Sequence, residues 1–428
     1  MKSSFSQSHL EALKTLSDRI VEAQKPIRIL DAIKWPDSVK KQFLQDRTLP
    51  VIDAEFYKKH APLSFDPKEK RREFHTIERD ITRNLGEMNP ISRIMRRMCR
   101  EYQHVIRMLE ARGTEDFSAL SQELYGSASD VFHAGDPTVA DLGRMLEETL
   151  TNLSAHPSMA DEAKNLDAKT AVNYLNEKLQ AVFPDAGIRV MMSDGITADA
   201  AAGTDYIKIN ENSMFNQQDL DILEVHEGWV HLGTTLNGMN QPYCTYLHKG
   251  PPSATVTQEG LAVLTEIMTL RASPVRLTKL MNRVRAVTLA EEGANFHEVF
   301  DYLVQHGLSD DDAWTIAARV FRGSAPNLGP FTKDITYLKG FILIFNFMRL
   351  AINRGKLDSL PMLFCGKINL EDIRTYAELA EMGVIAPPKF LPPYLKDFRG
   401  MATFMSFSRF INKLSFDKLE LDYGALLK

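Results

Sequence analysis

His226-Glu227-Gly228-Trp229-Val230-His231 is the stretch that decides how this chain is organised. Neutral imidazoles can hold a zinc ion, and a neighbouring carboxylate can take a proton from a water molecule on the metal. In the common H-E-x-x-H motif the two histidines lie four residues apart on one helical face. Here they lie five residues apart. The stretch therefore predicts a metal site on a helix of unusual local geometry.

The extra residue changes the angle between the two histidines. In a regular α-helix, at about 100° per residue, positions five apart differ by about 140°, whereas positions four apart differ by about 40°. A one-residue π-bulge would bring His231 back beside His226, and such bulges concentrate at functional sites. Gly228 lies between the histidines and eases a local distortion. We therefore predict the bulge at Gly228.

A catalytic zinc ion usually has three protein ligands and an open position for water. The best candidate for the third ligand is Glu259, within the segment TQEGLA at residues 257–262. It lies at the predicted start of a second helix, Glu259 to about Arg271, for which Thr257 is a plausible N-cap. Glu266 lies two turns further along the same face. It is an alternative ligand, or a residue that orients a ligand histidine.

Chance patterns must be weighed against this interpretation. With 11 histidines in the chain, a chance H-E-x-x-x-H has a probability on the order of a few per cent at average composition. From the spacing alone, a metal site and an ordinary pair of helix histidines both stay open. The sequence contains no G-x-x-x-x-G-K-[ST], G-x-G-x-x-G or G-x-S-x-G. Nucleotide binding and serine hydrolase chemistry therefore have no support.

The regions before and around the motif differ in pattern. Helical periodicity dominates up to about residue 165, with helices predicted at about 6–23, from 67, at 92–112 and at 138–153. Two short strands are then predicted at 188–192 and 206–210, separated by an Ala- and Gly-rich loop at 197–203. Asn216 with Asp219 predicts the start of the motif helix. A sheet edge along residues 206–210 could pair with an extended peptide.

Downstream of the motif the chain is again mainly helical. Helices are predicted at about 274–292, 297–306 and 310–321, followed by a buried apolar helix at 340–352 that is too short to span a bilayer. Residues 387–394 predict an extended, proline-rich strap over the surface. We predict an N-terminal helical region at 1–165, a catalytic domain at 166–390 and a C-terminal strap at 391–428. The predicted fold class is α+β, mostly helical, with a zincin-like core and a small sheet beside the active-site helix.

Composition limits the partners and the compartment. The net charge of −5 gives no reason to expect a nucleic acid partner. The three cysteines, Cys99, Cys244 and Cys365, are odd in number and far apart, so no disulfide framework is implied. Residues 1–30 do not resemble a signal peptide. We expect a cytoplasmic protein without a membrane partner, and the oligomeric state stays open.

The segments HEGWVH and TQEGLA together resemble the flavohemoglobin expression-modulating QEGLA motif proteins, whose eukaryotic relatives include the microtubule-associated tyrosine carboxypeptidase. Further similarity lies in residues 331–340 and in PPKFLPP at 387–393. The H-E-x-x-x-H spacing belongs to the pattern of this family. The resemblance implies zinc held by His226, His231 and Glu259, with Glu227 as the catalytic carboxylate.

These observations predict a zinc metallopeptidase, most simply a carboxypeptidase that removes C-terminal residues from a protein or peptide. Glu227 would act as general base and then as general acid. Tyr337, His248 and Arg322 are candidate donors to the oxyanion of the tetrahedral intermediate. The substrate's terminal carboxylate also needs a cation, for which Lys333 is the first choice and Arg322 the second.

Two other functions compete with this prediction. The first is a non-catalytic, zinc-binding regulatory protein that affects gene expression indirectly. The second is a zinc hydrolase that acts on a small amide. The presence of Glu227 beside both histidines favours catalysis, because a purely structural zinc site does not require that carboxylate.

Overall fold

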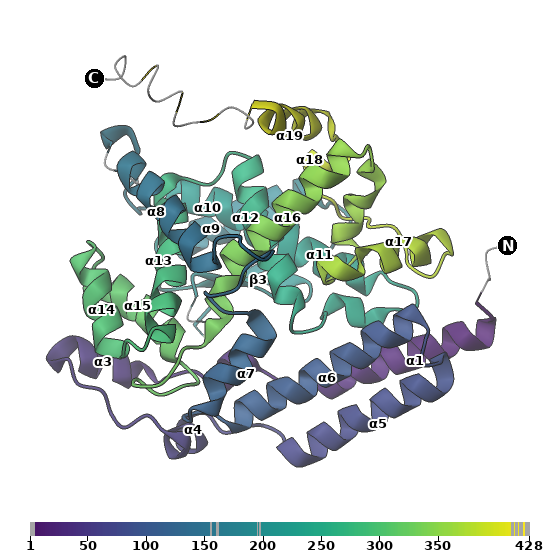
Figure 1. The fold of residues 1–428 in the computed structure, drawn as a ribbon, viewed down its shortest axis with the longest axis horizontal. Coiled ribbons are helices and arrows are strands. Elements are labelled where there is room, and N and C mark those ends of the chain that lie inside the picture. The colour runs from purple at the N-terminus through teal and green to yellow at the C-terminus, as the bar shows by residue number, and fades with distance from the viewer. Residues whose placement is uncertain are drawn as a thin grey trace.

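The computed structural model describes residues 5–411 except 155, 160, 161, 195 and 197, together with residues 415, 418 and 423. In this described part the chain is mostly helical and contains one three-stranded sheet, which confirms the predicted α+β class (Figure 1). Buried apolar side chains form three clusters. The central helices that carry the motif residues contribute to all three.

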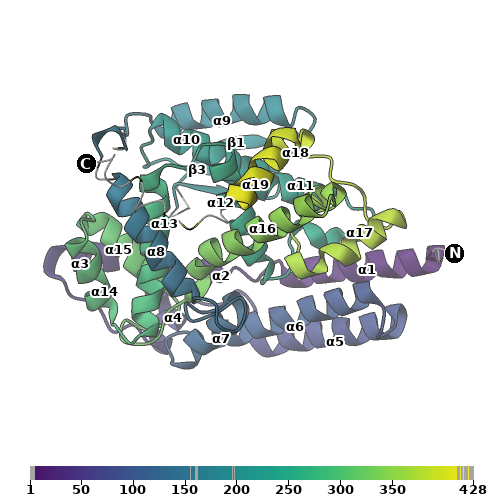
Figure 2. The same ribbon diagram turned by 45° about the horizontal axis from the view of Figure 1, so that its top comes forward.

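The predicted N-terminal helices are present. Three of them, α1 (Gln7–Gln24), α5 (Pro67–Leu85) and α6 (Pro90–Glu110), lie side by side at one end of the molecule (Figures 1 and 2). Proline occupies the first turn of α5 and of α6, where a missing backbone N–H costs nothing. The shorter helices of this region are α2 (Ile29–Ala32), α3 (Asp37–Asp46), α4 (Ala54–His60), α7 (Asp116–Tyr125) and α8 (Val139–Ser154).

The small sheet has a different edge from the one that we predicted. Its strands β1 (Arg189–Ser193), β2 (Ala200–Ala202) and β3 (Tyr206–Asn210) are ordered β1-β3-β2, with β3 parallel to β1 and antiparallel to β2. The predicted loop thus contains a strand, which an alanine run hardly announces because alanine is depleted in strands. As a result β3 is the central strand and cannot receive a peptide. Helix α9 (Ala168–Val182) covers the sheet (Figure 2).

The motif helix begins as predicted and then changes its winding. Asn216 caps α10 (Gln217–Leu223), and Asp219 completes a reciprocal capping box. The following segment η2 (Glu224–Leu232) is a π-helix, and α11 (Gly233–Met239) continues it as an α-helix. The predicted π-helical geometry is confirmed at the predicted place, but it extends over nine residues instead of one bulged position. Side chains five residues apart lie close together where the backbone hydrogen bonds run from i to i+5.

Two helices pack backbone against backbone at the centre of the molecule. Helix α12 (Ala254–Met268) contacts α16 (Ile335–Asn353), and a Cβ atom on Gly260 would lie only 2.2 Å from the carbonyl carbon of Gly340. By length and hydropathy alone, residues 332–353 could cross a membrane. In the structure α16 contacts α12 closely along one side (Figure 2), and 44% of its apolar window is buried.

The start of α12 corrects one prediction. The helix begins at Ala254, so Thr257 lies inside it and is not the N-cap. The hydroxyl of Thr257 instead accepts a hydrogen bond from the backbone N–H of Leu370, at 3.0 Å. This tertiary contact, 113 residues away in sequence, could not be read from the local pattern.

The remaining helices surround this centre. The three predicted helices α13 (Pro274–Glu291), α14 (Phe296–Gln305) and α15 (Asp310–Phe321) pack together beside α16 (Figure 1). The short 3₁₀ segments are η1 (Pro157–Met159), η3 (Thr245–His248), η4 (Thr332–Asp334), η5 (Leu357–Ser359), η6 (Pro361–Phe364) and η7 (Leu370–Asp372). The described chain closes with α17 (Ile373–Glu381), α18 (Pro393–Lys396) and α19 (Arg399–Ile411).

The proline-rich segment is anchored inside the protein and does not simply lie over its surface. The buried amide of Asn237 donates to the carbonyl oxygens of Phe364 and Phe390 and accepts from the N–H of Phe390. Phe390 is buried in the cluster around the sheet. Most of the predicted strap beyond residue 411 lies outside the described residues. The predicted domain boundaries stay a prediction.

Candidate metal centre

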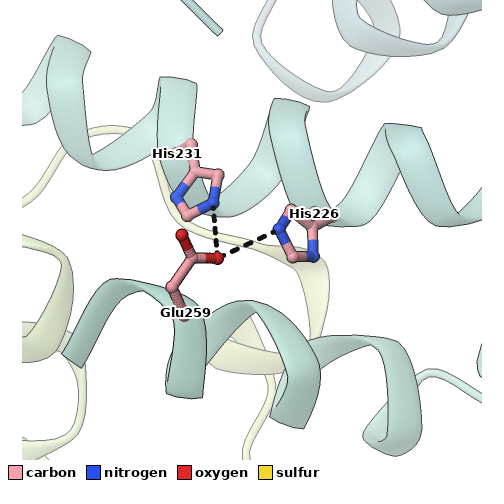
Figure 3. A group of neighbouring side chains, drawn as sticks. All are labelled: His226, His231 and Glu259. Carbon is pink, nitrogen blue, oxygen red and sulfur yellow. Dashed lines mark ion pairs between the residues drawn. The ribbon is translucent and has the colours of Figure 1, made fainter. Parts of the chain in front are cut away.

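Three predicted ligands converge between η2 and α12. His226 and His231 project from η2 toward the carboxylate of Glu259 on α12 (Figure 3). Oε2 of Glu259 lies 3.5 Å from Nε2 of His226 and 3.6 Å from Nε2 of His231. One ligand atom from each residue lies within 4.8 Å of the others. The π-helical winding is what puts both imidazoles on the side of η2 that faces α12.

The donor set fits a zinc ion. Oε2 of Glu259 is buried and has no hydrogen-bond partner, although an unpaired buried acceptor is costly. Ligand atoms about 2.1 Å from an ion, in tetrahedral directions, lie about 3.4 Å apart. The two observed separations from Glu259 to the imidazoles are close to that value. An ion with two nitrogen ligands and one oxygen ligand would satisfy the unpaired oxygen and leave a fourth position open.

A carboxylate behind His226 orients its ring. Nδ1 of His226 lies 2.6 Å from Oε1 of Glu266, which is fully buried. Because an ionised carboxylate only accepts, Nδ1 donates to Glu266, and Nε2 is the ring nitrogen that faces Glu259 and could bind a metal in place of a proton. Arg276 in turn donates to both oxygens of Glu266, at 3.0 and 3.1 Å. The structure thus places Glu266 behind the imidazole, on the ring nitrogen that faces away from Glu259.

Buried charges shift the pKa of each of these groups. Burial lowers the pKa of His226, but the carboxylates of Glu259 and Glu266 outweigh it and raise that pKa to about 10. Burial opposes ionisation of Glu266, but Arg276 and His226 lower its pKa to about 2. Burial also raises the pKa of Glu259. Lys333 and the two histidines outweigh it and hold that pKa well below its usual range. The centre therefore presents ionised carboxylates to any cation.

The second histidine and the candidate base have partners of their own. Nδ1 of His231 faces Oε1 of Gln258 at 3.5 Å, and that oxygen accepts from the hydroxyl of Thr234 at 2.8 Å. Oε2 of Glu227 accepts from the backbone N–H of Ala202 at 3.0 Å. This bond links the half-buried Glu227 to β2, an edge strand of the sheet. This bond fixes the carboxylate of Glu227, which directly follows His226 in the sequence.

Gly228 has a packing role that the sequence did not suggest. Its backbone is not in the left-handed region, so no special conformation requires glycine there. A Cβ atom on Gly228 would instead lie 2.3 Å from Cδ2 of Leu179 on α9. Glycine at this position lets α9 lie directly against the π-helical segment.

Of the other predicted site residues, Lys333 and Tyr337 lie beside the metal ligands, whereas Arg322 and His248 make their observed contacts elsewhere. Lys333 donates to Oε1 of Glu259 at 3.0 Å, and the ring of Tyr337 lies 6.5 Å from that of His226. Lys333 therefore already has a carboxylate partner. Arg322 ends α15 and lies over the ring of Phe331, 5.7 Å from its centre. The imidazole of His248 contacts the carbonyl of Thr245, and none of its observed contacts reaches the metal ligands.

Some polar residues of the centre were not predicted. Gln258 belongs to the TQEGLA segment, but no role was predicted for it; Arg276 lies in no motif, and Ala202 acts through its backbone N–H. Lys367 is a further case, because burial and the charge of Lys249 lower its pKa to about 8 while Glu227 and Glu259 raise it. Lys367 lies more than 100 residues from Glu259 in the sequence. Only the folded structure brings its charge close to the two carboxylates.

Comparison with known proteins identifies one family. The model of the family described as microtubule-associated tyrosine carboxypeptidase matches residues 41–413. Among curated proteins, none matches the chain. The matched span begins within α3 and includes the whole of the metal centre and its surrounding helices.

Proposed function

The chain belongs to the microtubule-associated tyrosine carboxypeptidase family, and on this premise we propose that it is a zinc-dependent carboxypeptidase. The observation that carries the proposal is the unpaired, buried oxygen of Glu259, which faces the ring nitrogens of His226 and His231. Glu227 directly follows the first of these histidines. Three ligands with an adjacent carboxylate are the composition of a hydrolytic zinc site.

Zinc bound by His226, His231 and Glu259 would lower the pKa of a water molecule toward about 7. Glu227 takes the proton of the attacking water and later delivers it to the leaving amine. The hydrogen bond from Ala202 orients its carboxylate for this transfer. The hydroxyl of Tyr337, whose ring lies near that of His226, donates to the oxyanion.

The substrate is an extended peptide that ends at the metal centre. The edge position of β2 supports this, because among the described residues β2 pairs only with β3, and the backbone N–H of Ala202 contacts Glu227. A peptide backbone added to that edge would lead directly to the base. The family description names tyrosine as the residue removed by the protein that it describes, so C-terminal tyrosine is the first residue to test here.

Three finer assignments are part of the same proposal. Within the family, we propose that the chain is a flavohemoglobin expression-modulating QEGLA motif protein, a proposal that the resemblance of its TQEGLA segment supports. The π-helix beside a small sheet serves as a zincin-like core. The three cysteines are free and buried, which suits a reducing cytoplasmic compartment.

The test combines metal analysis with peptide cleavage. The purified protein is incubated with a library of peptides that differ in their C-terminal residue, and products are read by mass spectrometry. Loss of single C-terminal residues is expected, together with about one zinc ion per chain. Glu227→Gln should keep the zinc and lose turnover by at least 100-fold, while Glu177→Gln, at an exposed position on α9, should change neither. Undiminished cleavage by Glu227→Gln would refute the proposed base.

A further inference from the structure

Helix α12 ends in a turn that holds an unusual residue. The backbone N–H of Leu270 donates to the carbonyl of Ile267 at 3.1 Å, and that of Arg271 donates to the carbonyl of Glu266 at 2.8 Å. These two bonds form a Schellman motif, which puts the residue after the helix cap in the left-handed region. Leu270 occupies this position, with a φ of 58°. Glycine or asparagine is usual there, because a larger side chain is strained in that conformation.

Burial does not compensate for this strain. The side chain of Leu270 is 90% exposed, more than any other large apolar side chain in the described part of the chain. Arg47 is the other non-glycine residue with a positive φ among the described residues, and its side chain pairs with Asp310 and lies over the ring of Phe300. The strain at Arg47 thus serves a contact inside the fold. Strained residues persist where something else compensates for them, so we look for the contact of Leu270 outside the chain.

A hollow lies directly beside Leu270. Its volume is about 510 Å³, and its lining comes from α10, from residues 270–274 and from residues 158, 159 and 162. Part of this lining is apolar, with Ala272, Pro274 and the exposed side chain of Met159. Leu270 belongs to the lining and is almost fully exposed, so it forms a projecting rim of the hollow.

The charges of the hollow do not prevent an identical surface from approaching it. Arg271 and Asp221 both line the hollow and pair with each other. Glu162, the remaining charged residue of the lining, is exposed to solvent. A surface that carried charges of one sign would repel its own copy, because like charges that meet across an interface are costly. Here both signs are present, and the one cation is already neutralised.

We propose that this surface forms a two-fold symmetric dimer, in which Leu270 of each chain enters the hollow of the other chain. A two-fold interface uses the same patch on both copies, so the patch must be complementary to itself. A projecting side chain next to a hollow meets this requirement, because a half-turn brings each leucine to the other hollow. A different partner would need only one of the two features. A contact limited to this patch is at the small end of protein interfaces, so the dimer should dissociate on dilution.

The first experiment measures the mass of the wild-type protein in solution. Analytical ultracentrifugation covers concentrations from about 1 to 500 µM, where weak interfaces are populated. The mass is expected to rise with concentration from that of one chain, 48.4 kDa, toward twice that value. Protein that keeps the mass of one chain throughout would overturn the inference and leave the surface to a different partner.

Leu270→Asn separates the contact from the fold. Asparagine tolerates the left-handed conformation, so the turn at the end of α12 is kept while the apolar side chain is lost. The dimer should weaken at least 10-fold, because two leucine contacts are removed. At about 1 µM, where both proteins should be monomers, the melting temperature should equal or exceed that of the wild type, with unchanged zinc content. The control is Met88→Asn, in the turn between α5 and α6, which removes a side chain that is 81% exposed and should leave the dimer unchanged. Wild-type dimerisation of Leu270→Asn would refute the contact.

A second variant tests the hollow itself. Ala272→Trp puts a large side chain into the hollow and leaves Leu270 in place. Alone, it should dimerise as poorly as Leu270→Asn. A mixture of the two variants combines an open hollow with an intact leucine and restores one of the two contacts. The mixture should therefore associate more tightly than either variant alone, and association no tighter than theirs would show that Leu270 does not enter the hollow.

Discussion

Replacing Gly260 by alanine tests the central packing of this protein more directly than any change to a ligand. A Cβ atom at this position would lie 2.2 Å from the carbonyl carbon and 2.3 Å from the carbonyl oxygen of Gly340. Nonbonded carbon atoms pack at about 3.5 to 4.0 Å. The obstructing atoms belong to the backbone and cannot rotate away, so α12 and α16 would have to separate by more than about 1 Å.

The free-energy cost of separating the two helices is partly offset by the higher helix propensity of alanine. Overpacking of a core costs about 1 to 3 kcal/mol, and the backbone clash puts Gly260→Ala at the upper end. Alanine stabilises a helix by about 1 kcal/mol relative to glycine. We therefore expect the free energy of unfolding to fall by about 2 kcal/mol. Glu259 precedes Gly260, so the ligand would move with the helix, and zinc affinity should fall at least 10-fold.

Chemical denaturation gives the free energy of unfolding, and competition with a chelator gives the zinc affinity. The control is Gly400→Ala in α19, where an added Cβ meets no atom within 4 Å and the backbone is not left-handed. It should leave stability unchanged or raise it slightly, with normal zinc affinity. A Gly260→Ala protein with wild-type stability and zinc affinity would show that the two helices do not touch as described.

Four other changes have defined outcomes. Glu266→Gln should lower zinc affinity about 10- to 100-fold, measured by chelator competition, because Nδ1 of His226 loses its charged acceptor. Asp334→Asn should lower the free energy of unfolding by about 3 kcal/mol in denaturant titration, because Arg319 is left buried and unpaired. Arg319 holds the pKa of Asp334 below its usual range against the effect of burial, so the wild type should lose that same contribution as the pH falls below about 4, and the variant should not. Removing zinc with a chelator should lower the melting temperature, and added zinc should restore it. Tyr337→Phe should reduce kcat about 100-fold in the peptide assay with normal zinc content, if its hydroxyl donates to the oxyanion.

The sequence predicted the local parts of the fold well. Capping by Asn216 and Asp219 located the start of the motif helix, and the spacing of His226 and His231 predicted its π-helical winding. These features depend on neighbouring residues and on the period of one helix, both of which can be read locally. Strand β2 was missed because an alanine run carries no strand signal, and its omission put the wrong strand at the edge of the sheet.

Only those residues of the metal centre that belong to a sequence motif could be predicted. His226, His231 and Glu259 converge in the structure, as their two segments suggested, while their metal and their roles stay predictions. Arg276 reaches the centre because α13 packs beside it, and no motif in the sequence points to this residue. Lys333 was a reasonable choice for an anion site, but only the structure shows that Glu259 already occupies it.

The amide of Asn237 has a consequence for the order of events during synthesis. It follows the metal-binding turn by only a few residues, yet its buried hydrogen bonds are made to Phe364 and to Phe390, which lies 153 residues further along the chain. At about 5 to 20 residues per second, a ribosome needs about 8 to 30 s to cover that distance. Throughout this interval the helix that carries both histidines lacks its final anchor. The nascent chain would therefore acquire a rigid metal centre, and with it any hydrolytic power, only after Phe390 has been synthesised.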